Sequence, residues 1–241
     1  MIMRIDFNSL KGIASNRNSN SVKNSSDCLF EFTSLLSNLI EEGQNLTEEE
    51  MAFFIMSMQN WIRRKSFTKY FDKSGDSSVN IGDVFFADLG IAYKPEIAYT
   101  HPVIILEKVK GYVLIVPITS SSDTVKKAYH PEDNPQGDKK FLKIKESEGV
   151  EKDCAAILTH IRTISPGRLL QKKSTLSNHV FDMVKEKTFY YSNPKKFSEF
   201  NKNLELIDEL NAELIDKNNK LDAALKEIES LKNTIYNTEV V

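Results

Sequence analysis

Residues 82–106 read GDVFFADLGIAYKPEIAYTHPVIIL and set the architecture of this 241-residue chain. An apolar run at Val84–Phe86 breaks at Gly90, and a second run, Val103–Leu106, begins after Pro102. Eleven residues, Ile91 to His101, stand between the two runs as a long polar loop. A loop held between two strands is a common place for a functional site, so we expect the site here.

Short apolar runs continue outward from this stretch and predict a small antiparallel β-barrel. They are rich in β-branched and aromatic residues and are bounded by Gly, Pro, Ser and Asp, as strands are. No helical pattern of about ten residues or more separates them before Leu170, and strands joined without a crossover helix pair antiparallel. The predicted strands are 84–86, 103–106, 113–116, 141–144 and 156–158, and a helix over 174–186 closes the domain.

Three motifs in order resemble the MazF/PemK (Kid) toxins of bacterial toxin–antitoxin pairs. The first is Gly82-Asp83-Val84 with Asp88-Leu89, Glu96 and Pro102; the second is Pro117-Ile118-Thr119-Ser120; the third is Ile161-Arg162-Thr163-Ile164 with Arg168-Leu169. A Gly149-Val150-x-x-Asp153 turn falls between the last two. The resemblance covers about residues 80–185 and implies an SH3-like barrel of the MazF/PemK/CcdB type.

This resemblance implies an endoribonuclease that cuts single-stranded RNA, such as mRNA, without a metal or cofactor. It places His101, Thr119 and Arg162 in the catalytic pocket, and we expect four further residues to bind substrate: Glu96, Tyr99, Ser120 and His160. Two positions depart from the family pattern, because His101 stands where the family has Arg and Ser165 stands where it usually has an acid.

The candidate residues suit RNA cleavage by the 2′-hydroxyl. This reaction needs a base that removes the hydroxyl proton and a hydrogen-bond donor that stabilises the negative charge developing on the phosphate. An imidazole titrates near neutral pH, so His101 can act as the base that a guanidinium cannot be. Arg162 can bind phosphate in a bidentate manner, or it can form an ion pair with Asp88 or Glu96. Thr119 can bond the phosphate or the hydroxyl, or cap the following turn.

For the remaining candidates, we expect Glu96 to orient the imidazole of His101. His160 falls on the face of Arg162 by strand alternation. Tyr99 and Tyr93 are available for base stacking beside a basic strand at 139–145. We interpret His130 and His179 as packing or solvent residues.

The flanks outside the barrel are predicted as separate segments. Ser and Asn dominate Ala14–Ser26, so we expect residues 1–26 to be disordered. Residues 27–70 fit a helical hairpin whose second helix opens with a capping box, Thr47 to Glu50, and a turn-rich segment, Phe71–Asn80, leads to the barrel at 80–188. Apolar heptads over 196–237 predict a coiled coil.

These flanks suggest partners and an alternative function. We expect a homo-oligomer, a dimer in the first instance, through the barrel or the coiled coil, and a cognate antitoxin. The hairpin or the coiled coil is expected to pack over Ile91–His101. The alternative is a catalytically impaired module of the same fold that binds RNA, DNA or protein.

Composition fits a cytoplasmic protein without a membrane span. The net charge is −2, so a nucleic-acid site has to be a local patch. No signal pattern or apolar run of about 18 residues occurs. Cys28 and Cys154 fit no metal spacing and are expected to be free thiols.

Overall fold

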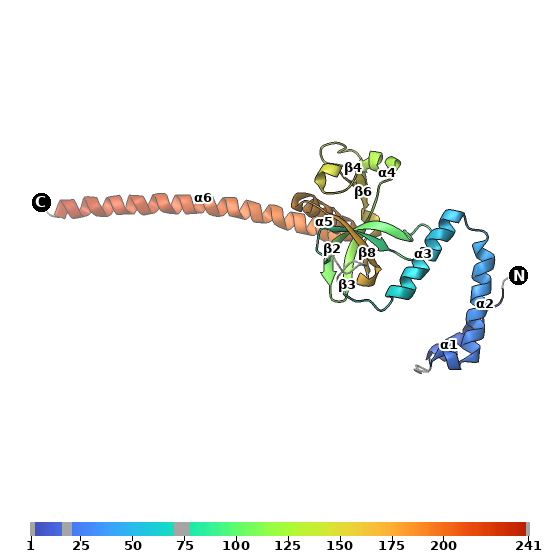
Figure 1. Ribbon diagram of the computed structural model, residues 1–241. Helices are drawn as coiled ribbons and strands as arrows, with labels where there is room; N and C mark the ends of the chain where they lie inside the picture. The colour runs from blue at the N-terminus through green and yellow to red at the C-terminus, as the bar shows by residue number, and fades with distance from the viewer. Residues whose placement is uncertain (1–2, 16–20, 70–77, 240–241) are drawn as a thin grey trace. The chain divides into compact units, whose positions relative to one another are not determined.

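The computed structural model describes residues 3–15, 21–69 and 78–239 (Figure 1). The chain forms two compact units. The first comprises Met1–Thr119 and Arg162–Thr175, and the second comprises Ser120–Ile161 and Leu176–Val241.

The first unit is built on five antiparallel strands. They are β1 (Asp83–Asp88), β2 (Thr100–Val109), β3 (Tyr112–Thr119), β7 (Arg162–Ile164) and β8 (Leu169–Thr175). β1 pairs with β2 and β8, and β3 pairs with β2 and β7. Their core is a fully buried cluster of ten side chains: Val79, Phe85, Ala87, Leu89, Val103, Ile105, Val113, Ile115, Ile164 and Leu169.

Helices α1 (Phe7–Ser15), α2 (Ser26–Gly43) and α3 (Glu48–Arg64) precede these strands, and the 3-10 turns are η1 (Val22–Asn24) and η4 (Pro166–Arg168). The predicted capping box is present: Thr47 Oγ1 accepts from the Glu50 amide, and the Glu50 carboxylate accepts from the Thr47 amide. Met3 and Asp6 hydrogen-bond to α2 through Asn38 and Glu31.

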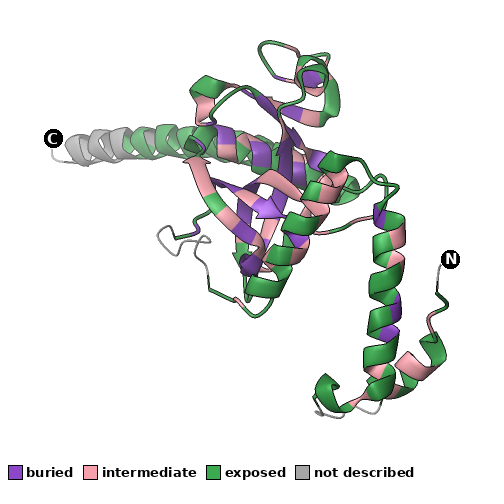
Figure 2. Ribbon diagram, turned by 45° about the vertical axis from the view of Figure 1, so that its right-hand side comes forward, coloured by how far each residue is buried: buried purple, intermediate pink, exposed green. Residues whose placement is uncertain are grey.

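The apolar side chains of α2 remain exposed, as Figure 2 shows along most of the helix. Both predicted helices of the hairpin are therefore present, but α2 does not bury its apolar face among the described residues. The exposed side chains are Leu29, Phe30, Phe32, Leu35, Leu36, Leu39 and Ile40.

The second unit contains α4 (Ser122–Lys127), β4 (Ala128–Tyr129), β5 (Asp138–Ile144), η2 (Glu146–Glu148), β6 (Cys154–Ile157), η3 (Leu158–His160), α5 (Asn178–Ser192) and α6 (Pro194–Glu239). β5 pairs with β6 antiparallel and with β4 parallel. α6 exposes Leu210, Leu214 and Leu221, which lie on the predicted coiled-coil seam. None of the described helices is long and apolar enough to cross a membrane.

The predicted fold class, an α+β chain with mainly antiparallel strands between helical flanks, is confirmed. Several local predictions were wrong. Helix α1 occupies 7–15, where we expected disorder, β4 pairs parallel, and the closing helix spans Asn178–Ser192 because β8 continues to Thr175. The parts of the predicted linkers at 16–20 and 71–77 lie outside the described residues.

Candidate active site

The loop between β1 and β2 is closed at its base by backbone hydrogen bonds. The Leu89 amide donates to the Tyr99 carbonyl at 2.7 Å, and the Tyr99 amide donates to the Gly90 carbonyl at 2.6 Å. β2 begins at Thr100, so His101 is a strand residue opposite Ala87 and not the last residue of the loop. The second residue of β2 therefore carries the candidate base.

Strand register places the three catalytic candidates on one face. His101 alternates with Val103 and pairs with Ala87, and both of these belong to the buried cluster. Val103 pairs with Pro117, so the same register continued by two residues sets Thr119 opposite His101. Arg162 pairs with Ile115, which also lies in the cluster. Because cross-strand partners share a face, the three residues lie at the rim of this core.

The imidazole of His101 is half-buried, and its Nδ1 atom finds no hydrogen-bond partner among the described residues. Burial lowers the pKa of His101 first, and the positive charge of Arg162 lowers it further, against opposing backbone contacts at Ala98 and Thr100. A histidine with a lowered pKa is neutral at physiological pH, which is the form that accepts a proton.

Arg162 is held at the foot of the loop. Its Nη2 donates to the Ile97 carbonyl at 2.9 Å, whereas its buried Nε finds no partner among the described residues. Burial lowers the pKa of Arg162, repulsion by Arg168 adds to this, and Glu96 opposes it. A buried donor without a partner is costly.

Within the described part of the chain, Arg162 forms no ion pair with Asp88, the alternative considered above. The Asp88 carboxylate accepts instead from the Ser57 hydroxyl at 2.8 Å and from the Gly90 amide at 2.9 Å. Glu96 is exposed and acts electrostatically on Arg162. No hydrogen bond or ion pair joins Glu96 to His101 among the described residues, and its expected role in orienting the imidazole stays a prediction.

Helix α3 also contacts this loop. The Phe53 and Tyr99 rings stack with centroids 5.8 Å apart and planes 17° apart. Tyr99 adopts a left-handed backbone (φ 60°), and its ring already has a partner, whereas Tyr93 is 89% exposed. The expectation that the hairpin packs on this loop is confirmed for α3.

Three further residues of this region were missed from the sequence. Arg64, at the end of α3, is buried and donates to the carbonyls of Gly167 and Leu169 at 2.8 and 3.0 Å. Arg168 donates to the Asp88 carbonyl at 3.0 Å, and Trp61 borders a cavity of about 390 Å³ between α3, the start of the loop and η4. Arg168 was visible in the third motif, but no local pattern marked Arg64 or Trp61.

Two substrate-binding candidates, Ser120 and His160, belong to the second unit. His160 lies in the 3-10 turn η3, and its Nδ1 is 3.0 Å from the Thr159 hydroxyl. β7 begins only at Arg162, so strand alternation does not place His160 on the face of that residue and this argument was wrong. Ser120 follows β3 and is exposed. Their roles in binding remain predictions.

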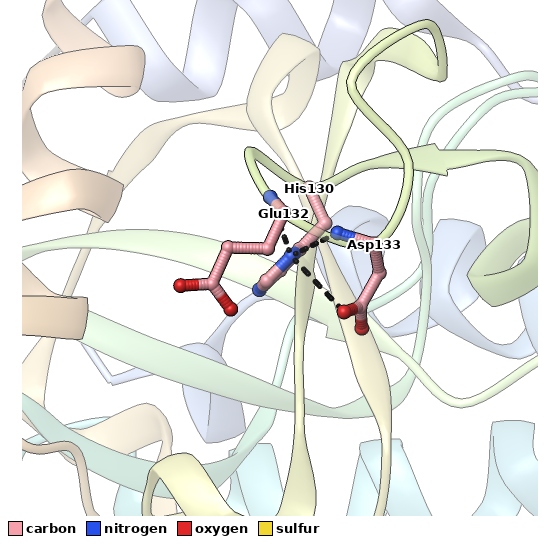
Figure 3. A group of neighbouring side chains, drawn as sticks. All are labelled: His130, Glu132 and Asp133. Atoms are coloured by element: carbon pink, nitrogen blue, oxygen red, sulfur yellow. Dashed lines mark hydrogen bonds and ion pairs between the residues drawn. The ribbon is translucent and has the colours of Figure 1, made fainter.

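A group of His130, Glu132 and Asp133 in the second unit resembles a metal site in composition (Figure 3). The His130 Nδ1 atom accepts hydrogen bonds from the Glu132 and Asp133 amides at 3.2 and 3.1 Å, so its lone pair is occupied. Asp133 pairs with Lys143 and Lys145, and His130 itself is buried. The group is therefore a structural turn, as expected for a packing histidine.

The family comparison matches the segment that contains these strands and the loop. Residues 80–188 match the model of a PemK-like, MazF-like toxin of type II toxin-antitoxin systems. The resemblance of this segment to the MazF/PemK toxins, inferred from the three motifs, is thus confirmed. The helices α1 to α3 and the whole of α6 lie outside the matched segment.

Solved structures of such toxins are similar to part of this chain. An endoribonuclease in complex with its cognate antitoxin from Mycobacterial species has 12% identity and a TM-score of 0.35, over 48% of this chain and 96% of the other. MazF from Deinococcus radiodurans has 16% identity and a TM-score of 0.37, over 47% and 96%. Mycobacterium tuberculosis toxin MazF-mt6 has 13% identity and a TM-score of 0.31, over 45% and 92%. No curated protein sequence matches the chain.

Proposed function

We propose that this protein is a metal-independent endoribonuclease that cleaves single-stranded RNA. The observation that carries the proposal is the placement of His101 and Arg162 on one face of the sheet, at the edge of a loop, within the segment that resembles the MazF/PemK toxins. The lowered pKa of His101 supports its role as a base at neutral pH.

In the proposed reaction His101 takes the proton of the ribose 2′-hydroxyl, and the 2′-oxygen attacks the adjacent phosphorus. Arg162 donates to the phosphate through the guanidinium donors that Ile97 leaves free, which stabilises the added negative charge. Thr119 bonds a phosphate oxygen. The P–O5′ bond then breaks, leaving a 2′,3′-cyclic phosphate and a 5′-hydroxyl whose proton comes from the imidazolium or from water.

The test is cleavage of end-labelled single-stranded RNA by the purified full chain in the presence of EDTA. We expect cleavage by the unaltered protein and its loss in His101→Ala and Arg162→Ala, with circular dichroism unchanged. His179→Ala is the matched control, because His179 is exposed on α5. Unaltered cleavage in both site variants would remove these residues from the mechanism.

The exposed apolar side chains of α6 and the resemblance to toxins suggest the partners of this protein. We propose a homo-oligomer joined through the apolar seam of α6, an antitoxin that binds the toxin domain, and action in the cytoplasm, where mRNA is found. The runner-up function is a binding module without catalysis. RNA binding with no cleavage at stoichiometric protein would favour this module over the nuclease.

A further inference from the structure

The cavity beside α3 has the size and lining of a small-ligand site. Its volume of about 390 Å³ falls within the usual range for such sites, about 300 to 1,000 Å³. Trp61 and Ile91 supply apolar surface, and both side chains are more than half exposed, at 54% and 55%. All residues around the cavity belong to the first compact unit.

The charges at this cavity favour an anion. Arg64, Lys65, Arg168 and Asp88 border it. The Asp88 carboxylate is engaged by Ser57 and Gly90, and the Arg64 guanidinium by two backbone carbonyls. Neither Lys65 nor Arg168 forms an ion pair with a carboxylate among the described residues. The local charge is therefore positive although the chain as a whole carries −2.

One wall of the cavity combines a cation with an aromatic ring. The Lys65 ammonium lies 4.7 Å from the centroid of the Trp61 ring system. Single-stranded nucleic acids are bound by this combination, in which bases stack on aromatic rings and cations follow the phosphates. The same chemistry tolerates any base, because every base has a π face.

Arg168 connects the cavity to the candidate active site. It borders the cavity, and its charge also lowers the pKa of Arg162. Gly90 makes room for it: a Cβ at this position (φ 81°) would lie 2.8 Å from Arg168 Nη1. One guanidinium thus borders the cavity and also acts electrostatically on the proposed phosphate ligand Arg162.

We propose that this cavity is a nucleotide subsite for the single-stranded RNA, with Trp61 stacking on a base and Lys65 and Arg168 binding the neighbouring phosphates. The proposal rests on the proposed function and adds a substrate-binding element from α3, outside the family domain. An acidic peptide is the competing occupant, and the experiment separates it from RNA.

Trp61 is the single tryptophan of the chain, so its fluorescence reports directly on the site. The full chain is titrated with a short 2′-O-methyl single-stranded oligonucleotide, which lacks the attacking hydroxyl and is not cleaved. We expect saturable quenching of Trp61. In parallel, the anisotropy of a dye-labelled oligonucleotide should show roughly tenfold to hundredfold weaker binding for Trp61→Ala, because each stacked base contributes about 1–3 kcal/mol.

Matched variants show whether a loss of affinity comes from base stacking on Trp61 or from a change in the stability of α3. Trp61→Phe should retain most of the affinity. Ile62→Ala, on the same helix and exposed but away from the cavity, should leave affinity unchanged. Lys65→Gln should lower the salt dependence of binding by about one counterion, with helicity preserved in each variant.

The outcomes distinguish this proposal from the nuclease assignment. Cleavage of unmodified RNA without quenching, and with the same KM in Trp61→Ala, overturns the subsite alone. Quenching without cleavage overturns the nuclease assignment and leaves the cavity as a nucleic-acid site. Quenching by an acidic peptide that displaces the oligonucleotide, or equal affinity for inorganic polyphosphate, overturns base stacking at this site.

Discussion

Replacing Arg64 by methionine tests whether α3 is an integral part of the toxin domain. The Arg64 side chain is buried and donates to the Gly167 and Leu169 carbonyls, and its guanidinium carbon lies 4.5 Å from the Phe67 ring centroid. Hydrogen bonds to a charged group contribute about 1.5–3 kcal/mol each. Methionine keeps an apolar stem but leaves both carbonyls without these donors, so we expect Arg64→Met to cost about 3–5 kcal/mol.

The assay is urea unfolding followed by the fluorescence of Trp61, which lies one helical turn before Arg64 on α3. Hydrogen exchange of α3 amides shows whether the loss is local undocking or global unfolding. Arg64→Lys should retain only part of the stability. A lysine ammonium can still donate hydrogen bonds, but it lacks the planar arrangement of donors with which the guanidinium reaches two carbonyls. Arg63→Met is the control, since Arg63 is exposed, and should stay within about 0.5 kcal/mol. Equal effects of the Arg63 and Arg64 changes would refute the anchoring of α3.

Three further predictions concern the proposed base, the thiols and assembly. His101→Ala should lower kcat by roughly 10²- to 10⁴-fold. In the unaltered protein kcat/KM should fall only as the pH drops below the usual imidazole range, because the pKa of His101 is lowered. Arg162→Gln should raise the pKa of His101, followed by NMR titration of the imidazole, because it removes a positive charge. Burial raises the pKa of Cys154 to about 12. Mass spectrometry after iodoacetamide treatment should therefore find Cys28 alkylated, and Cys154 unmodified until denaturant is added. Equal labelling of the two thiols in the folded protein would contradict this. Leu214→Asp, on the exposed α6, should reduce the mass measured by light scattering, and an unchanged mass would exclude the α6 seam as the interface.

The sequence predicted the strands whose residues carry a local signal. Val84–Phe86 and Val103–Leu106 are β-branched or aromatic runs, and both lie in paired strands. β8 was not predicted, because LLQKKST alternates apolar and polar residues only weakly and is defined by its pairing with β1 through two register shifts. Whether a segment forms a strand depends on the strands that it pairs with, and these are not visible in the segment itself.

The shared face of His101 and Arg162 was within reach of sequence reasoning, because the motifs fix the strands and alternation fixes the face. The contacts of α3 were not. Ser57 and Asp88 are 31 residues apart, and Arg64 and Gly167 are 103 apart, so no local pattern connects them. Such contacts depend on how distant segments pack together, and the residue pattern of a single segment does not predict them.

The position of Trp61 outside residues 80–188 has a consequence for engineering. A graft that carried only residues 80–188 of this chain onto another toxin would lack Trp61, which lines the cavity. It would also lack Arg64, which hydrogen-bonds to Gly167 of η4. A transplant meant to carry over substrate choice therefore has to start at Glu48, where α3 begins.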